Sequence, residues 1–166
     1  MIDVHARLTQ AFDVLPLIDG FKPNYKWGDD HHLNKLLKLY INDNSKNIYP
    51  LIYNVSNRSS QSEMSNEATV ELSLIIATRN KNTDWHNGNR WATSYKNVLF
   101  PMVKNMAQLF YKSGFTYWDG RYELYEFPNY GNTEENKTLD IWDALRMDLR
   151  LNITNNCLYK EIIFND

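Results

Sequence analysis

The sequence has only one cysteine, Cys157, among its 166 residues, so the chain cannot form an internal disulfide bond. No apolar run approaches the roughly 18 residues that a membrane-spanning helix needs. The N-terminus lacks a basic segment followed by an apolar block, so we expect no signal peptide and a protein made in the cytoplasm. The net charge of −2 argues against a dedicated nucleic-acid-binding protein, because such proteins are usually strongly basic.

The motifs of common catalytic and metal sites are also missing. The sequence has no glycine-rich phosphate loop, no G-x-S-x-G motif and no Walker lysine. The neighbours His31 and His32 would point to different sides of a helix, so one metal ion cannot easily bind both. Asp140 and Asp143 would point to opposite faces of a strand, which suits neither a carboxylate dyad nor a two-metal site. We therefore expect no enzyme activity, no metal and no cofactor.

Two long segments that alternate between apolar and polar residues are the clearest pattern in the chain. In residues 67–78, every second position from Ala68 to Ile76 is apolar, and Thr69, Glu71 and Ser73 lie between them. Residues 141–153 alternate in the same way, with charged side chains on one face. This period is typical of strands with one buried face, and twelve such residues would span about 40 Å. Strands of this length in a small domain are expected to extend beyond the core or to pair with another chain.

A helical pattern stands between these two strands. Apolar residues from Trp91 to Phe110 follow the i, i+3, i+4, i+7 repeat, which predicts a helix over about residues 89–113. Ser113-Gly114 marks its C-terminal end. Pro101 lies inside the pattern and lacks a backbone N–H, so we expect a kink there or a first turn that starts later.

The remaining elements are shorter. Helices are expected at residues 3–15, where Asp3 is the candidate N-cap, and at residues 29–41, which open with two aspartates. Residues 49–55 predict a buried strand. A hairpin is expected around Asp119-Gly120, a strong turn dipeptide, with residues 115–118 and 121–127 as its arms. Loops are expected at residues 17–28, 56–66, 79–90 and 128–138.

Together these elements predict one α+β domain over residues 1–166. Its α/β core would occupy residues 49–159 and consist of a single small antiparallel or mixed sheet, packed by the long helix. Residues 1–48 would add an N-terminal helical element containing the two further helices.

Several aromatic and charged residues are candidates for contact with other subunits, because Trp, Tyr and Arg are enriched at protein interfaces. Trp85 lies in a polar loop and Trp142 on the otherwise polar face of the last strand, whereas Trp91 is expected in the core. Arg146 and Arg150 share a strand face, where they stay solvated, pair across strands or, on a closed ring, line the bore or meet a neighbour. The full set of candidate subunit-interface residues is Arg58, Glu63, Arg79, Trp85, Arg90, Tyr130, Trp142, Arg146 and Arg150.

One order of segments resembles a known family. A strand that ends in IIATRN (residues 75–80) is followed by a polar loop and by NRWATSYKNVLFP (residues 89–101), and a long helix, a hairpin and the DLRL strand (residues 148–151) complete it. Residues 49–159 resemble in this way the tail-terminator, or tail-completion, and neck-ring proteins of tailed bacteriophages. The segments are similar to those of neck proteins from phages of Bacteroidetes, including crAss-like phages.

The resemblance implies a structural protein of the virion, made in the cytoplasm of the bacterial host. Such proteins form closed rings, here of six or twelve copies, between the portal end of the capsid and the tail. Their partners are copies of themselves, neighbouring neck or portal-adaptor proteins and tail proteins, and phage DNA passes through the bore without sequence recognition. The family implies an α/β fold whose sheet joins or abuts that of the neighbour, with no cofactor. Residues 1–48 fit the family pattern less well.

Other functions stay open on the residues alone. The same loops and aromatic side chains suit a monomeric or dimeric protein-binding module of a phage or its host. A small enzyme of unfamiliar type is a third alternative, and it would require a metal-dependent activity that is lost on changing Asp140 or Asp143. The ring is the leading hypothesis, because long strands with free edges and long polar loops supply the two different surfaces that each subunit of a ring needs.

Overall fold

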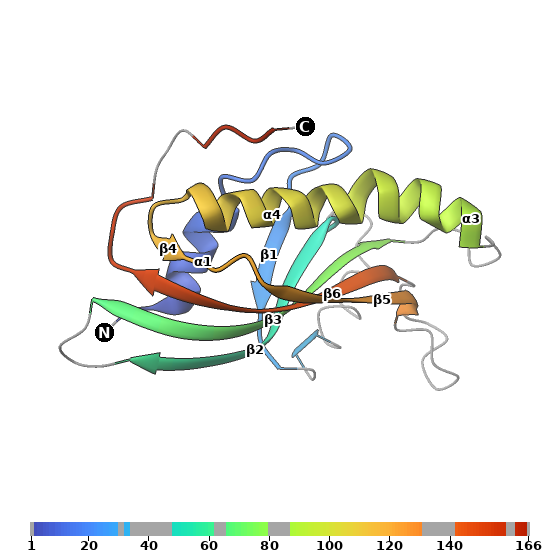
Figure 1. The fold of residues 1–166 in the computed structure, drawn as a ribbon. Coiled ribbons are helices and arrows are strands. Elements are labelled where there is room, and N and C mark those ends of the chain that lie inside the picture. Colours follow the sequence, from blue (N-terminus) through green and yellow to red (C-terminus); the bar gives the residue numbers. More distant parts are fainter. Residues whose placement is uncertain are drawn as a thin grey trace.

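The computed structural model describes residues 2–29, 32–33, 48–61, 66–79, 87–130, 142–158 and 162–165. Within them the chain forms an α+β fold, in which helices cover one face of a single six-stranded sheet (Figure 1). In chain order the elements are α1 (Val4–Phe12), β1 (Asn24–Trp27), β2 (Leu51–Gln61), β3 (Glu67–Arg79), α3 (Asn87–Arg90), η1 (Trp91–Leu99), α4 (Phe100–Lys112), β4 (Thr116–Tyr117), β5 (Tyr122–Tyr130) and β6 (Trp142–Thr154).

The sheet is mixed and is centred on the two long alternating strands. Its order is β1-β2-β3-β6-β4, and β5 also pairs with β6. β1 runs parallel to β2, and every other pairing is antiparallel. β3 and β6 pair over their whole length, from Glu67 opposite Thr154 to Arg79 opposite Trp142. The predicted α+β class and the two long strands are therefore confirmed, and the parallel β1–β2 pair makes the sheet mixed.

The main core lies between this sheet and the helices. Apolar residues at alternate positions of β3 and β6 pack against α4, which buries Met102, Val103, Met106, Leu109 and Phe110. α1 joins the same layer, since the rings of Phe12 and Phe110 lie 5.8 Å apart between centroids. The N-cap of α1 is Asp3, as predicted, and its carboxylate accepts a hydrogen bond of 3.0 Å from the backbone N–H of Ala6.

The predicted long helix is confirmed as a continuous run of α3, η1 and α4, but its middle differs from the expectation. Residues of η1 are π-helical, and the backbone N–H of Phe100 donates to the carbonyl of Tyr95, five residues earlier. Pro101 follows at the start of α4 and has no backbone N–H to donate to the preceding turn of the continuous helix. The irregularity that was expected in the helix near Pro101 therefore takes the form of a π-helical segment that precedes the proline.

Three predicted loops contain strand residues. Residues 24–27 of the expected loop 17–28 form β1, which is held by parallel pairing with residues 51–54. β2 continues through the polar residues 56–61 because each lies opposite a residue of β3. β5 likewise extends to Tyr130, which lies opposite Trp142. The polar composition of these residues does not predict strands, because they lie at sheet edges and are held there by backbone pairing.

The predicted hairpin around Asp119-Gly120 is wrong in its pairing. β4 and β5 do not pair with each other; they lie one after the other along β6, opposite residues 152–153 and 142–149. β6 is long enough for both, so the turn joins two segments of one sheet edge. Gly120, with a φ of 82°, supplies the left-handed backbone of that turn.

The expected helix at 29–41 lies largely outside the described residues, as do most of the 79–90 loop and the tips of the 56–66 and 128–138 loops. Its start is described, since the Asp29 carboxylate accepts a hydrogen bond of 2.7 Å from the backbone N–H of His32. Among the described residues, no helix combines the length and apolar character that crossing a membrane requires.

Candidate functional site

One face of the sheet lies away from the helices and is here called the open face. Both α1 and α4 belong to the core on the opposite side. The open face is polar, and most of its residues are exposed or half-buried, in contrast to the helix-covered face. Its residues are Thr69, Glu71, Ser73, Tyr117, Glu123, Tyr125, Arg146, Asp148, Arg150 and Asn152.

Asp148 is the centre of a hydrogen-bonded network on the open face. Its carboxylate accepts hydrogen bonds of 2.6 Å from Ser73 Oγ and 3.0 Å from Arg146 Nε, and a second oxygen lies 2.9 Å from Arg146 Nη2. The guanidinium of Arg146 also lies 6.0 Å from the ring centroid of Tyr125. The Tyr125 hydroxyl donates to Glu123 at 2.6 Å, and this hydrogen bond raises the pKa of Tyr125. The bidentate pair fixes Arg146 in one orientation.

The second predicted arginine, Arg150, lies opposite Glu71 of β3 in the register and is exposed. Next to this pair, Thr69 Oγ1 donates to Asn152 Oδ1 across the strands at 2.9 Å. The open face therefore carries both charge signs, with Glu71 opposite Arg150 across the strands and Arg146 paired with Asp148 along β6. The sequence pointed to Arg146 and Arg150 here, but it did not select Asp148, which pairs with Arg146, or Glu71, which lies opposite Arg150 in the register.

Two strand edges flank this face on opposite sides of the sheet. β1 pairs with β2 only up to Asn54, so residues 55–61 of β2 have no strand on their outer side among the described residues. The outer side of β5 likewise has no strand partner within the part of the chain that is described. In Figure 1 the end of the β2–β3 hairpin extends beyond the C-terminal end of α4. Unpaired backbone N–H and C=O groups make such edges suited to strand addition.

Trp142 was expected at an interface, and the structure shows that this is wrong, because its side chain is 0% exposed. It does lie on the same face as Arg146, but there a second core covers this end of the sheet. That core also contains Leu33, Ile48 and Tyr49, and the Trp142 indole N–H donates a hydrogen bond to the Tyr49 hydroxyl. Residues that are distant in the sequence therefore bury Trp142, although the strand pattern predicts that its position is on the surface.

Arg90 is also in the interior, contrary to its prediction as an interface residue. It is 5% exposed and its Nη1 lies 3.8 Å from Oδ1 of Asp143, which is 0% exposed. Tyr95 lies in the same buried cluster, and burial, followed by the charge of Asp143, raises the pKa of its hydroxyl. These groups connect the start of the long helix to the start of β6 and stabilise the fold.

Trp91 shows the opposite deviation. It was expected in the core, but its side chain is 49% exposed and stacks on Tyr95, with ring centroids 5.9 Å apart. The π-helical hydrogen bonds of η1 change the angular spacing of side chains from the 3.6-residue repeat. Trp91 therefore falls outside the apolar stripe that the sequence predicts.

The other candidate residues are only partly described. Arg79 is exposed at the end of β3. Arg58 and Tyr130 belong to β2 and β5, but their side chains lie outside the described residues, as do Glu63 and Trp85 altogether. The structure thus brings Arg146 and Arg150 together on the open face and places Arg79 at the end of a neighbouring strand.

These surfaces combine a polar strand face with strand edges that have no partner among the described residues. Among the described residues, no three His, Cys, Asp or Glu side chains gather as ligands of a metal ion would. A comparison with known protein families finds no match to this chain, and no curated protein matches its sequence.

Proposed function

We propose that this protein is a structural subunit of a closed homo-oligomeric ring in the neck of a tailed bacteriophage, where the capsid portal complex joins the tail. The observation that carries the ring is the pair of strand edges that have no partner among the described residues, β2 beyond Asn54 and β5, on opposite sides of one sheet. A ring of identical subunits requires two different surfaces on each subunit, which meet head to tail and close by rotation.

The directions of the strands suit this closure. Because β2–β3, β3–β6 and β6–β5 are all antiparallel, β2 and β5 run in opposite directions. Copies related by rotation about an axis roughly parallel to the strands would bring β5 of one subunit beside β2 of the next in antiparallel orientation. Antiparallel pairing of two free edges forms regular hydrogen bonds and removes an aggregation hazard from each subunit.

The location in a phage neck is supported by the resemblance of residues 49–159 to tail-terminator and neck-ring proteins. An α+β core with one helix-covered sheet agrees with a fold of that type. The partners are then further copies of this chain, adjacent neck or portal-adaptor proteins and tail proteins. The slightly acidic net charge suits a conduit through which phage DNA slides without sticking.

The test is the mass of the purified protein together with its presence in virions. Light scattering after size-exclusion chromatography should give about 118 or 236 kDa, which is six or twelve times the chain mass of 19.7 kDa. Electron micrographs of the same fractions should show rings, and purified phage particles should contain the chain. A protein that stays monomeric at high concentration and is absent from particles would instead be a soluble binding module.

Proline substitutions on β2 test the edge itself. Neighbouring residues direct their backbone N–H groups to opposite sides of a strand, so one of Ser59→Pro and Ser60→Pro removes an outward N–H and the other removes a bond to β3. The outward variant should keep the thermal stability of the subunit but lose the ring. If both variants form rings as well as the native chain, this edge is not the subunit contact.

A further inference from the structure

Two strand edges, β2 beyond Asn54 and β5, have no strand partner among the described residues, and they carry charge of opposite sign. β5 contains Glu123 and Glu126 but no basic residue. Residues 55–61 of β2 contain Arg58 but no acidic residue. An acidic edge and a basic edge attract each other, whereas two copies of the same edge repel. The proposed ring, on which this inference rests, joins these two edges.

A row of alternating charge crosses the open face and ends at the β2 edge. Arg58 lies opposite Glu71 of β3, and Glu71 lies opposite Arg150 of β6. Directly opposite residues share a face of the sheet, so Arg58 belongs to the open face. The row therefore consists of a cation, an anion and a cation from the β2 edge inward, and an anion on a neighbouring subunit would continue it outward.

Glu123 is the acidic residue of β5 on this same face. It lies opposite Asp148, whereas Glu126 lies opposite Leu145 of the main core and thus on the helix-covered face. Two carboxylates at opposite positions are unfavourable within one subunit. Arg146 pairs with Asp148 at 2.9 Å, but Glu123 has no ion-pair partner among the described residues. A cation on the next subunit would compensate Glu123.

Backbone hydrogen bonds show which groups of β2 point outward. The carbonyl of Asn54 accepts a hydrogen bond of 3.2 Å from the N–H of Gly28, so the backbone groups of Asn54 point away from β3. Those of its partner Leu74 consequently point to β6, and alternation along β3 directs those of Glu71 to β2. The backbone groups of Arg58, opposite Glu71, therefore point to β3, and the residues on either side of Arg58 direct their N–H and C=O groups outward.

The outward groups of β5 follow from the same alternation. Met147 lies opposite Leu74 and directs its backbone groups to β3, so those of Asp148 point to β5. Glu123, opposite Asp148, directs its groups to β6, and the residues on either side of Glu123 point outward. Because outward groups must meet outward groups in an antiparallel pair, Glu123 can lie opposite Arg58 or opposite a residue two positions away from it.

We propose that the subunits of the ring join in the register that places Glu123 of one copy opposite Arg58 of the next. The residues on either side of each then form the backbone hydrogen bonds between the two strands. A shift by two residues in one direction would bring β5 opposite Asn54, whose carbonyl is already bonded to Gly28. A shift by two in the other direction would place Glu123 opposite the uncharged Ser60. Charge and backbone pairing therefore favour the same register.

The test reverses each charge and then mixes the variants. Glu123→Arg and Arg58→Glu should each raise the dissociation constant of the subunit contact about tenfold, because like charges then meet. An equimolar mixture should return to within about threefold of the native chain, since a ring in which the two variants alternate joins opposite charges at every contact. Light scattering over a dilution series in about 50 mM salt, where exposed charges are weakly screened, measures these constants.

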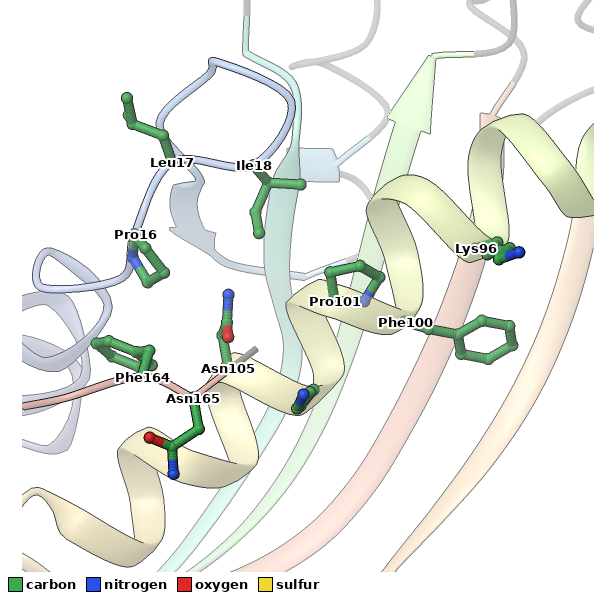
Figure 2. Close-up of a pocket in the computed structure, with 10 residues that line it drawn as sticks. Pro16, Leu17, Ile18, Lys96, Phe100, Pro101, Asn105, Phe164 and Asn165 are labelled. Carbon is green, nitrogen blue, oxygen red and sulfur yellow. The ribbon is translucent and has the colours of Figure 1, made fainter.

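Two control variants change the charge equally at positions outside the contact. Glu126→Arg alters the same strand on its other face. Lys104→Glu alters an exposed cation on α4, in a groove between this helix, the loop after α1 and the C-terminal segment (Figure 2). Both controls should assemble within about twofold of the native chain.

Disulfide formation between introduced cysteines reports the register directly. In Arg58→Cys/Glu123→Cys, with Cys157→Ser to remove the native thiol, the Cα atoms of the two cysteines would lie about 5 Å apart across the contact. Within one subunit β3 and β6 separate these positions by at least about 14 Å, so a disulfide joins different subunits. Mild oxidation should give covalent multimers on a non-reducing gel, several-fold more than for the shifted pair Ser60→Cys/Glu123→Cys.

The outcomes separate this register from the ring itself. A native chain that stays monomeric overturns both. If the native chain assembles, the register alone is overturned by a mixture that assembles no better than its components, or by a loss in Glu126→Arg as large as in Glu123→Arg. It is also overturned if the Ser60 pair gives more covalent multimer than the Arg58 pair.

Discussion

The buried ion pair between Arg90 and Asp143 gives the sharpest prediction about stability. Both side chains are in the interior, with Nη1 and Oδ1 3.8 Å apart. Neither carboxylate oxygen of Asp143 has a hydrogen-bond partner within the described part of the chain. The guanidinium is thus the one described cation that compensates this buried charge. Replacing Arg90 with methionine keeps much of the apolar volume but leaves the carboxylate unpaired.

Breaking a buried pair in this way costs about 3–5 kcal/mol of unfolding free energy. With a urea dependence of about 2 kcal/mol per molar for a domain of this size, Arg90→Met should lower the unfolding midpoint by roughly 1.5–2.5 M. The double variant Arg90→Met/Asp143→Leu also removes the unpaired buried carboxylate. It should therefore recover most of the lost unfolding free energy.

Urea unfolding followed by tryptophan fluorescence, at one fixed protein concentration, measures both variants. The same samples should keep the native circular dichroism spectrum in the absence of urea. A loss below about 1 kcal/mol for Arg90→Met, or a double variant that is no more stable than the single one, would refute the assignment of this pair as a buried, mutually dependent contact.

Three further variants test other parts of the fold. Trp142→Phe removes the indole donor to Tyr49 and should cost about 1–3 kcal/mol in urea unfolding, whereas a surface residue would cost almost nothing. Met106→Ala, in the centre of the main core, should cost about 2–5 kcal/mol in the same assay. Burial lowers the pKa of His5 below its usual 6.5, against an opposing effect of Asp3, so the unfolded chain takes up the proton first. The contribution of neutral His5 to the free energy of unfolding is therefore fully present above pH 6.5 and is lost as the pH falls. Melting temperatures between about pH 7.5 and 5 should fall less for His5→Gln than for the native chain.

The sequence predicted the parts of the fold that depend on local periodicity. The alternation in β3 and β6 and the apolar stripe of α4 follow from burial of one face, so they are visible without tertiary information. β1 and the polar end of β2 were missed because backbone pairing to a neighbouring strand holds them, not an apolar pattern. β4 and β5 lie one after the other because β6 is long enough to pair with both. The turn dipeptide Asp119-Gly120 contains no information about the length of that partner strand.

The candidate surface was predicted less completely. Arg146 and Arg150 were found because charges at alternate positions of a strand share a face. Trp142 was misplaced because the cover over it comes from Ile48 and Tyr49, almost a hundred residues earlier in the chain. Trp91 was misplaced because π-helical spacing cannot be seen in an apolar repeat.

The central claim is that the outer edges of β2 and β5 pair with each other between neighbouring subunits. It is tested most directly by mixing two variants, one with proline at the outward β2 position and one with its counterpart on β5, chosen from Glu123→Pro and Glu126→Pro. Each variant alone retains one free edge and should be monomeric by light scattering. Their mixture should form a heterodimer of about 39 kDa, twice the chain mass of 19.7 kDa, because the intact β5 edge of one meets the intact β2 edge of the other. A mixture that stays monomeric, while the native chain assembles, would contradict the pairing.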